Sequence, residues 1–270
     1  MTTTDADVGI HRHGSGRPAT LLGGLSVAVC DMHAAADGFI EHALRARGKA
    51  LRPFYSTSAN GQVIAQCLQN AAWQDMISEA DQIHADGMPM VLFSKLLSAN
   101  PVPERVATTD LVHAVADRAQ RAGVSFYFLG GTEEINGKAV AAMQATYPSL
   151  VFAGRRNGYF SPEEEADVVA DIRAAKPDIL WVGLGFPNEQ AFVSRNIDNL
   201  RGVGVVKTSG GLFDFLSGKN RRAPTWMQRV GLEWAFRTWL EPRRLGRRYL
   251  VTSPVSLYAL LVRSDLTGRH

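Results

Sequence analysis

The sequence lacks most of the residues and motifs on which common catalytic centres depend. Only two of its 270 residues are cysteines. Because Cys30 and Cys67 both fall in elements expected to be buried, we expect two reduced core thiols rather than a disulfide or a metal pair. None of the seven histidines stands at a metal-ligand spacing from another, and no Gly-x-Ser-x-Gly motif occurs. These absences argue against a zinc centre and against a serine hydrolase.

The phosphate-binding motifs of the best-known nucleotide enzymes are also missing. No Gly-Lys-Ser/Thr and no complete Gly-x-Gly-x-x-Gly is present, which disfavours ATP and NAD chemistry. The only Asp-x-Asp, Asp5-Ala6-Asp7, lies near the N-terminus. A metal-dependent sugar transferase would instead need such a pair where it holds its ion to the donor pyrophosphate. We therefore expect no metal ion and no cofactor.

No run of apolar residues approaches the ~18–20 that a membrane-spanning helix needs. The longest candidate, residues 251–262, is interrupted by serine and proline. The first 17 residues are polar and lack the apolar stretch of a signal peptide, so we expect a loose arm over residues 1–20. Together these features predict a cytoplasmic protein that associates peripherally with the inner face of the membrane.

Positive charge is concentrated at the C-terminal end of the chain. Residues 219–270 contain 11 Lys and Arg against 3 Asp and Glu, whereas the preceding 218 residues contain 18 and 23. Trp226, Trp234 and Trp239 lie among these cations. Because tryptophan favours the water–lipid boundary and arginine holds phosphate bidentately, this segment favours a membrane surface as its partner. A solvated basic helix, or one that binds nucleic acid, is the alternative.

Short apolar runs alternate with helical stretches over most of the remaining chain. Helices are expected at 111–121, at 133–146 and after Ser161-Pro162-Glu163-Glu164, where serine would cap the helix and proline would take its first position. This alternation predicts an α/β fold: a doubly wound, largely parallel sheet with flanking helices over residues 21–218. A basic helical C-terminal appendage, 219–270, would follow, with helices at 224–240 and 242–251. The expected strands are 25–29, 53–56, 82–84, 125–129, 150–153, 179–182 and 204–207.

Three glycine-rich loops follow expected strands, on the side where such sheets bind ligands. Glycine lets the backbone approach a ligand closely, and the helix that follows offers free N–H groups to an anion. Three loops of this kind at one sheet edge favour a nucleotide or sugar-phosphate site and argue against a nucleic-acid partner. The glycines concerned are Gly130, Gly131, Gly185, Gly210 and Gly211.

Asp86 follows the expected strand 82–84 and precedes a glycine, so its carboxylate should point into the ligand crevice. It could serve as a general base or hold a substrate hydroxyl, and an Asx-turn or helix cap is the alternative. Ser58 and Asn60 end the preceding strand and should lie beside it. Arg105 should lie near the same edge, where phosphate binding and a surface ion pair compete.

The order of short motifs resembles the WecG/TagA/CpsF family of bacterial glycosyltransferases (glycosyltransferase family 26) from about residue 56 to 250. The resemblance is carried by Ala85-Asp86-Gly87, Pro103-Glu104-Arg105-Val106, Phe128-Leu129-Gly130-Gly131, Asn157-Gly158-Tyr159-Phe160, Pro177-Asp178-Ile179-Leu180, Gly183-Leu184-Gly185-x-Pro187, Gly210-Gly211-x-Phe213-Asp214-Phe215-x-x-Gly218, Arg222-Ala223-Pro224, Leu232-Glu233-Trp234-x-x-Arg237 and Glu241-Pro242-x-Arg244-x-x-Arg247-Arg248-Tyr249.

This resemblance implies an inverting, metal-independent transferase that moves a sugar from a UDP donor to a polyprenyl-diphosphate-linked saccharide, forming a β-linkage. Surface or exopolysaccharide biosynthesis would be its context. Asp86 would be the general base and Asn60 would share its pocket. Arg105 would meet the donor diphosphate and Asp214 would lie near the uridine. Three arginines of the appendage would close over the diphosphate and the lipid head group: Arg237, Arg244 and Arg247.

Two positions depart from the family pattern. Ser58 stands where the family usually has threonine, which preserves the hydroxyl. The family's Pro-x-Gln-Glu reads Pro187-Asn188-Glu189-Gln190, so the sequence leaves open which of Glu189 and Gln190 faces the ligand. It also leaves open whether the donor carries N-acetylmannosamine, its uronic acid, glucose or glucuronic acid.

A catalytically idle nucleotide-sugar-binding component of a polysaccharide assembly complex is the alternative function. The retained Asp86 and the appendage arginines argue against it. An oligomer is compatible with the sequence, which does not decide the point.

Overall fold

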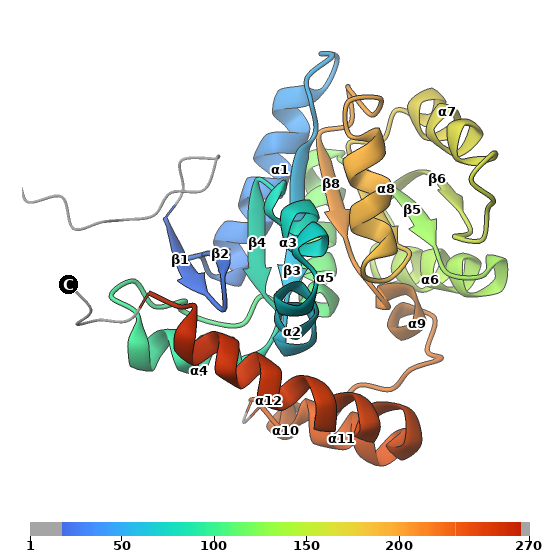
Figure 1. Cartoon of the computed structure of the whole chain (residues 1–270). Coiled ribbons are helices and arrows are strands. Elements are labelled where there is room, and N and C mark those ends of the chain that lie inside the picture. The colour runs from blue at the N-terminus through green and yellow to red at the C-terminus, as the bar shows by residue number, and fades with distance from the viewer. Residues whose placement is uncertain (1–17, 230, 266–270) are drawn as a thin grey trace, which may run out of the picture.

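Six parallel strands form the central sheet, in the order β4-β3-β8-β7-β5-β6 (Figure 1). This computed structural model describes residues 18–229 and 231–265, except for the side chains of Arg229, Arg244 and Arg247. The predicted doubly wound α/β fold is confirmed. The strands are β3 (Phe54–Ala59), β4 (Gln82–Ala85), β5 (Ser125–Gly130), β6 (Val151–Arg156), β7 (Ile179–Gly183) and β8 (Val205–Thr208).

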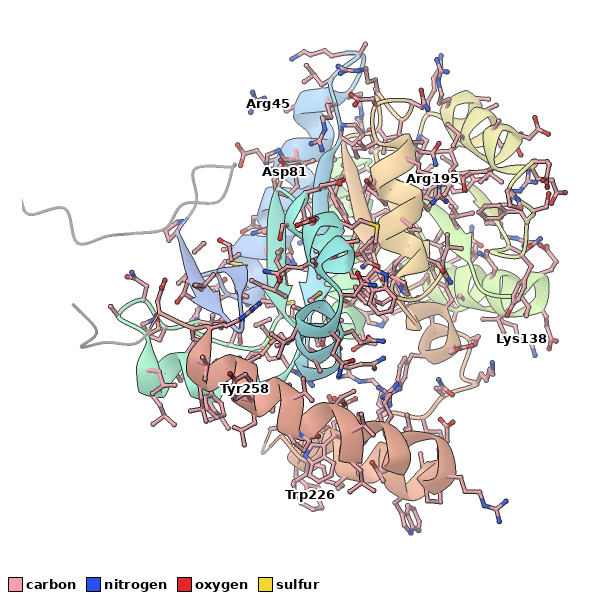
Figure 2. All side chains as sticks on the ribbon, viewed as in Figure 1. Arg45, Asp81, Lys138, Arg195, Trp226 and Tyr258 are labelled. Atoms are coloured by element: carbon pink, nitrogen blue, oxygen red, sulfur yellow. The ribbon has the colours of Figure 1, made fainter. Side chains whose placement is uncertain are left out.

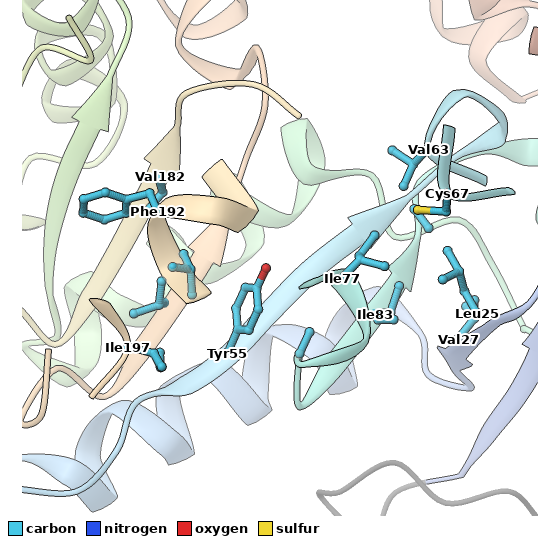
Figure 3. Packing of buried hydrophobic residues seen from close by; sticks show 14 of the residues in the cluster. Leu25, Val27, Tyr55, Val63, Cys67, Ile77, Ile83, Val182, Phe192 and Ile197 are labelled. Carbon is cyan, nitrogen blue, oxygen red and sulfur yellow. The ribbon is translucent and has the colours of Figure 1, made fainter. Parts of the chain in front are cut away.

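Helices cover both faces of this sheet, because its central strands are apolar on both sides. In β7, Ile179 and Trp181 pack into the core on one face, and Leu180 and Val182 pack into the core on the other. Figure 3 shows the second core, where Tyr55, Ile83 and Phe192 contribute. The first face carries α1 (Met32–Ala46), α5 (Thr108–Ala122), α6 (Glu133–Thr146) and α9 (Leu212–Leu216), and the second carries α2 (Gly61–Gln69), α3 (Ala71–Ser78), α7 (Glu165–Ala175) and α8 (Asn188–Asn196).

Residues 25–29, expected as a strand of the sheet, belong instead to a separate antiparallel hairpin. β2 (Leu25–Ala28) pairs with β1 (Ala19–Leu22) through Gly23 and Gly24, whose φ angles are 60° and 85°. Glycine is favoured in such a two-residue turn because both positions require positive φ. β1 thus begins inside the range assigned to the loose arm, and residues 1–17 of that arm lie outside the described residues.

The helix expected to start at Ser161-Pro162 begins later, at Glu165. The Ser161 N–H donates to Glu164 Oε2 at 2.7 Å and the Ser161 carbonyl accepts from the Glu164 N–H at 3.1 Å. These reciprocal bonds close a turn over residues 161–164, so the serine caps a turn rather than the helix. Both cysteines are free as predicted, although only Cys67 is fully buried.

The C-terminal segment is helical, with boundaries that differ from those expected. The predicted helix 224–240 is divided into α10 (Thr225–Arg229) and α11 (Glu233–Leu240), with Gly231 at φ 77° between them. A π-helix, η1 (Pro242–Gly246), leads into α12 (Arg247–Val262), which runs past Pro254 and well beyond the expected end at residue 251. No helix within residues 18–229 and 231–265 is both long and apolar enough to cross a membrane.

α12 is anchored on the body of the protein at its C-terminal end. It packs on α2, with Ala259 and Leu260 buried in the core. Beyond it, the Gly24 N–H donates to the Arg263 carbonyl at 2.7 Å and the Asp265 N–H donates to the Leu21 carbonyl at 3.1 Å. The basic appendage therefore shares the core of the sheet domain and closes onto the β1–β2 hairpin.

Candidate active site

A cavity of about 880 Å³ lies where the carboxyl ends of β3, β4, β7 and β8 face α11 and α12. β3 and β8 are neighbours, yet the helix after β3 (α2) and the helix after β8 (α9) lie on opposite faces of the sheet. Parallel sheets open a crevice at such a point. The cavity brings together eleven of the residues predicted from the sequence: Ser58, Asn60, Asp86, Arg105, Gly185, Glu189, Gln190, Gly210, Gly211, Asp214 and Arg237.

Asp86 stands at the end of β4, at the inner wall of the cavity. Its N–H donates to the Ala59 carbonyl at 2.8 Å, and its Oδ2 accepts from the Thr108 N–H at 3.3 Å. Burial raises the pKa of the Asp86 carboxyl, while Arg105, the Thr108 N–H and Lys207 oppose the rise. A carboxylate with a raised pKa is a stronger base, which suits proton abstraction from a hydroxyl.

Asn60 ends β3 and caps α2, where its Oδ1 accepts from the Val63 N–H at 3.2 Å. The first residues of α2 and the Asn60 cap lie on the cavity wall beside Asp86 and Gly87. A capping residue is fixed by the helix that it caps. Its free amide group is therefore held at a fixed point of the cavity.

Lys207 was missed by the sequence reasoning. It lies at the end of β8 with none of its surface exposed, and its Nζ donates to Ser58 Oγ at 2.8 Å and to the Thr208 carbonyl at 2.9 Å. Burial lowers the pKa of the Lys207 ammonium to about 8, against the opposing effect of Asp86 and Glu189. In the sequence, Lys207 is a polar residue at the end of an apolar strand, a position that does not by itself indicate a functional site.

The neighbours Glu189 and Gln190 both lie on the cavity wall and both are almost fully buried. Glu189 Oε2 accepts from the N–H groups of Gly185 (3.2 Å) and Gly210 (2.8 Å), so this carboxylate ties two of the glycine loops together. Gln190 Nε2 donates to Thr57 Oγ1 at 3.3 Å. Glu189 therefore shapes the loops, whereas Gln190 keeps its Oε1 without a hydrogen-bond partner among the described residues.

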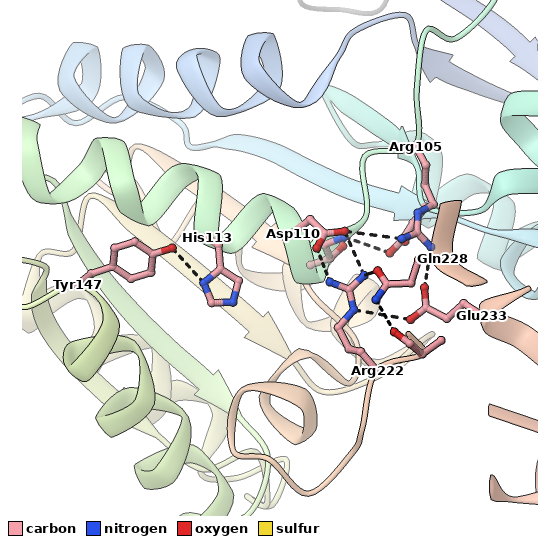
Figure 4. Close-up of polar contacts among 10 residues, drawn as sticks. Arg105, Asp110, His113, Tyr147, Arg222, Gln228 and Glu233 are labelled. Atoms are coloured by element: carbon pink, nitrogen blue, oxygen red, sulfur yellow. Dashed lines mark hydrogen bonds and ion pairs between the residues drawn. The ribbon is translucent and has the colours of Figure 1, made fainter. Parts of the chain in front are cut away.

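Arg105 is held in a network of ion pairs at the edge of the cavity (Figure 4). Its Nη1 donates to Glu233 Oε2 at 2.8 Å, and its Nη2 lies 3.6 Å from Asp110 Oδ2. Arg222 pairs with the same Asp110 and lies 3.7 Å from Glu233 Oε1. Phosphate binding and a surface ion pair were the two alternatives for Arg105. The structure shows an ion pair, but its partner, Glu233 of α11, is largely shielded from solvent. The network joins α5 to the C-terminal segment.

Cations and aromatic rings from the C-terminal segment face the strand ends. The Arg237 guanidinium lies 5.4 Å from the centre of the Phe215 ring, and Arg248 lies 5.1 Å from the Tyr249 ring. Asp214 lies on α9, where Oδ1 accepts from Lys219 Nζ at 3.1 Å. Arg248, Tyr249 and Trp234 also line the cavity. All three belong to the family motifs, but the sequence did not predict them as site residues.

Two groups of predicted residues stand apart from this arrangement. Gly130 and Gly131 do not line the cavity; a Cβ on Gly130 would lie 2.2 Å from the Gly183 carbonyl oxygen, so this loop needs glycine for strand packing. The side chains of Arg244 and Arg247 lie outside the described residues. Within residues 18–229 and 231–265, no three His, Cys, Asp or Glu side chains are grouped so that they could hold a metal ion.

Comparison with known proteins gives the same family as the motifs. The sequence model of the glycosyl transferase WecG/TagA/CpsF family matches residues 20–270. An N-acetylglucosaminyldiphosphoundecaprenol N-acetyl-beta-D-mannosaminyltransferase of Bacillus spizizenii is 31% identical over 194 residues, covering 72% of this chain and 74% of the relative. A protein of the same name from Staphylococcus aureus is 28% identical over 206 residues, covering 76% and 79%. The chain therefore belongs to the WecG/TagA/CpsF family of glycosyl transferases.

Proposed function

We propose that this protein is an inverting glycosyltransferase that moves a sugar from a UDP donor to a polyprenyl-diphosphate-linked saccharide, in bacterial surface or exopolysaccharide biosynthesis. The observation that carries the proposal is one cavity that holds a partly buried carboxylate, Asp86, together with Arg105, Arg237 and Arg248. The names of the two relatives support a lipid-diphosphate-linked acceptor and an N-acetylmannosamine-type donor.

The chemistry is a single displacement at the anomeric carbon. The acceptor hydroxyl attacks C1 from the face opposite the diphosphate, and Asp86 takes the hydroxyl proton as the new bond forms. The C1–O bond to UDP breaks with inversion, which makes a β-linkage from an α-linked donor. Because one carboxylate is sufficient as base, no second carboxylate is needed as nucleophile.

Negative charge builds on UDP as it leaves, so cations close to the diphosphate stabilise the transition state by a few kcal/mol each. Arg105, Arg237 and Arg248 are the described guanidinium groups on the cavity wall. In our proposal they take the role that a metal ion has in other sugar transferases. Asp214 and the Gly210-Gly211 loop would hold the uridine end.

The acceptor lipid gives a reason for the apolar outer surface of the C-terminal segment. Trp226 and Tyr258, labelled in Figure 2, and Trp239 and Leu250 are all more than half exposed. Leu96, on α4 (Met88–Leu97), is 75% exposed, and Phe93 of the same helix lines the cavity together with Leu257 of α12. A large exposed apolar surface beside basic residues is typical of a membrane-facing side. We propose that this side rests on the inner face of the membrane.

The test is UDP release by the purified protein. A panel of UDP-N-acetylmannosamine, its uronic acid, UDP-glucose and UDP-glucuronic acid is offered with a short-chain prenyl-diphosphate saccharide, in parallel reactions without and with EDTA. We expect UDP release from one donor, only when the acceptor is present, and an inverted product linkage by NMR. Absence of release from every pair contradicts the proposed function, and loss of release on adding EDTA contradicts metal independence.

The same assay tests the base. Asp86→Asn should lower turnover by roughly 10²–10⁴-fold, the usual contribution of a general base, and should not weaken UDP binding, since binding does not need the proton acceptor. Asp198→Asn is the matched control, because Asp198 is an exposed carboxylate paired with Arg201 away from the cavity. Wild-type turnover in Asp86→Asn removes Asp86 from the mechanism.

A further inference from the structure

Lys207 lies directly behind the wall of the proposed active site. Its side chain is fully buried and does not line the cavity, from which Ser58 and Thr208 separate it. A buried ammonium is costly unless opposite charges or hydrogen bonds compensate it. The site thus contains a charged group that the sugar transfer, as described above, does not use.

The hydrogen bonds of Lys207 lead towards Asp86. An ammonium can only donate hydrogen bonds, so Ser58 Oγ accepts from Lys207 Nζ at 2.8 Å. The Ser58 hydroxyl can then donate its own hydrogen bond to Thr108 Oγ1 at 3.1 Å. The Thr108 N–H in turn donates to Asp86 Oδ2 at 3.3 Å. Lys207, Ser58, Thr108 and Asp86 are therefore linked residue by residue, with the step through Thr108 passing from its hydroxyl to its backbone N–H.

The charges around Lys207 also link it to Asp86. The carboxylates that act on Lys207 are Asp86 and Glu189. Glu189 already accepts two backbone N–H groups, from Gly185 and Gly210. Asp86 has one such bond, and its other cation, Arg105, is shared with Glu233 and Asp110. Lys207 is thus the cation near Asp86 that no other ion pair among the described residues engages.

We propose that Lys207 is a positioning residue for Asp86: through its charge and through Ser58 and Thr108, it keeps the Asp86 carboxylate ionised and aimed into the cavity. This inference rests on the proposed function, since it gives Asp86 the role of base. Lys207 does not touch either substrate. Its effect is to hold Asp86 in the form that accepts a proton.

The expected signature is a shift in pH dependence rather than a uniform loss. Without the ammonium, the pKa of Asp86 rises further, because burial and repulsion from Glu233 are less opposed. Loss of an opposite charge within about 4–6 Å raises a carboxyl pKa by about one to three units, and we expect the lower end of that range because Lys207 acts less strongly on Asp86 than Arg105 does. The acidic limb of kcat/KM should therefore move upward in pH. A purely structural role for Lys207 would lower the rate by the same factor at every pH.

The first experiment compares the pH profiles of kcat/KM for UDP release in wild type, Lys207→Met and Lys138→Met. Lys138 is an exposed lysine of α6 and serves as the matched control. In Lys207→Met the apparent pKa of the acidic limb should be higher by about one unit or more. Activity should therefore be roughly tenfold lower at pH values below that pKa and should partly recover at higher pH. The profile of Lys138→Met should match that of the wild type.

The second experiment needs no activity and no Lys207 variant. Carbon-labelled lysine in the wild type should show one of the six side chains titrating well below the others by NMR. In Asp86→Asn that titration should move lower still, because the coupling between two sites is reciprocal. This reading stands even where Lys207→Met fails to fold.

The outcomes separate the two proposals. Wild type that releases no UDP overturns the proposed function and the role of Lys207 with it. Wild type that releases UDP, with an unshifted profile in Lys207→Met or with a lysine titration that Asp86→Asn does not move, overturns the inference on Lys207 alone.

Discussion

The ability of Arg105 to bind a ligand depends on the ion pair that it already makes with Glu233. The 2.8 Å bond to Glu233 occupies the guanidinium that we expect to meet the donor diphosphate. Both side chains are less than a fifth exposed, so this pair is weakly screened by solvent. The donor must therefore compete with Glu233 for Arg105.

Glu233→Gln should tighten UDP binding, because it frees Arg105 and removes a negative charge from the cavity wall. We expect a fall in Kd of roughly fivefold, equivalent to about 1 kcal/mol, by isothermal titration calorimetry. Glu165→Gln is the control: it also takes a carboxylate from an arginine, Arg195, but outside this cavity. Unchanged affinity in Glu233→Gln would mean that Arg105 does not meet the diphosphate.

Asp178 illustrates a residue whose charge matters for folding. Its carboxylate accepts from Arg47 at 2.8 and 2.9 Å and from the N–H and hydroxyl of Ser125 at 2.8 and 2.9 Å. Burial alone would raise the pKa of Asp178, but these bonds outweigh it and hold the pKa below its ordinary value. The ionised form is therefore bound more strongly in the folded state than in the unfolded chain.

For this reason, Asp178 should stabilise the fold above the unfolded pKa of about 4, and the contribution should be lost as pH falls through the lower folded value. Asp178→Asn should cost about 1–2 kcal/mol of unfolding free energy at pH 7, and the difference from wild type should shrink on acidification. Urea unfolding between pH 7 and pH 3 measures it. A difference independent of pH would show that charge is not the cause.

Residue-level chemistry could be predicted from the sequence only where local pattern determines position. Asp86 was found because a strand precedes it and a glycine follows it, which fixes it at a sheet edge. Lys207 could not be found, because its burial depends on β3 and on Ser58, which are distant in sequence. The partner of Arg105 was unpredictable for the same reason, since Glu233 lies 128 positions away.

At the scale of elements, the break between α10 and α11 places the residues of α11 on the cavity. A Cβ on Gly231 would lie 3.0 Å from the Cβ of Met88, and the backbone there has φ 77°. The approach to α4 therefore requires glycine. This contact sets the direction in which α11 presents Glu233, Trp234 and Arg237.

Gly231→Ala should displace α11 and lower kcat, by roughly tenfold if one strong donor to the diphosphate is weakened by about 1.4 kcal/mol. Gly123→Ala is a matched control, because Gly123 has φ 63° but open space around its Cβ. Both variants should lose similar stability from backbone strain, about 1 kcal/mol, by thermal unfolding. Equal kcat in the two variants would contradict a special role for Gly231.

The regular elements were the most predictable part of the fold. All six sheet strands were located to within a few residues, because each is a short apolar run bounded by turns. β1 was missed because it lies at the boundary of the polar N-terminal segment, inside the range assigned to the loose arm. The continuation of α12 past Pro254 was missed because its packing on α2, a tertiary contact, outweighs the local preference of proline against helix.

At the scale of the whole molecule, charge and apolar surface gather on the side that carries α10, α11 and α12. The sequence predicted this from composition alone, since composition does not depend on contacts. It did not predict that α4 contributes Leu92 and Leu96 as exposed apolar residues beside the same cavity. The membrane-facing side in our proposal is thus formed by two separate parts of the chain.

Leu96→Glu and Leu250→Glu should each weaken co-sedimentation with vesicles that contain phosphatidylglycerol, because each places a charge on the apolar side. Burial of a leucine side chain is worth about 1.5–3 kcal/mol, so we expect roughly a tenfold loss of vesicle binding. Binding of UDP should not change. Leu44→Glu, an exposed leucine of α1 on the opposite face of the sheet, is the control. Retained vesicle binding in Leu96→Glu would exclude α4 from the contact.

The C-terminal segment is attached to the body at both ends and along its length, where Glu233 pairs with Arg105 and α12 packs on α2. Arg222 holds its start against Asp110, and the bonds of residues 263–265 to the hairpin hold its end. A segment attached at both ends cannot open by rotation about a single hinge. We therefore expect access to the cavity to require bending of the segment between its two ends, so that the lipid-linked acceptor of our proposal would enter from the side, beneath it.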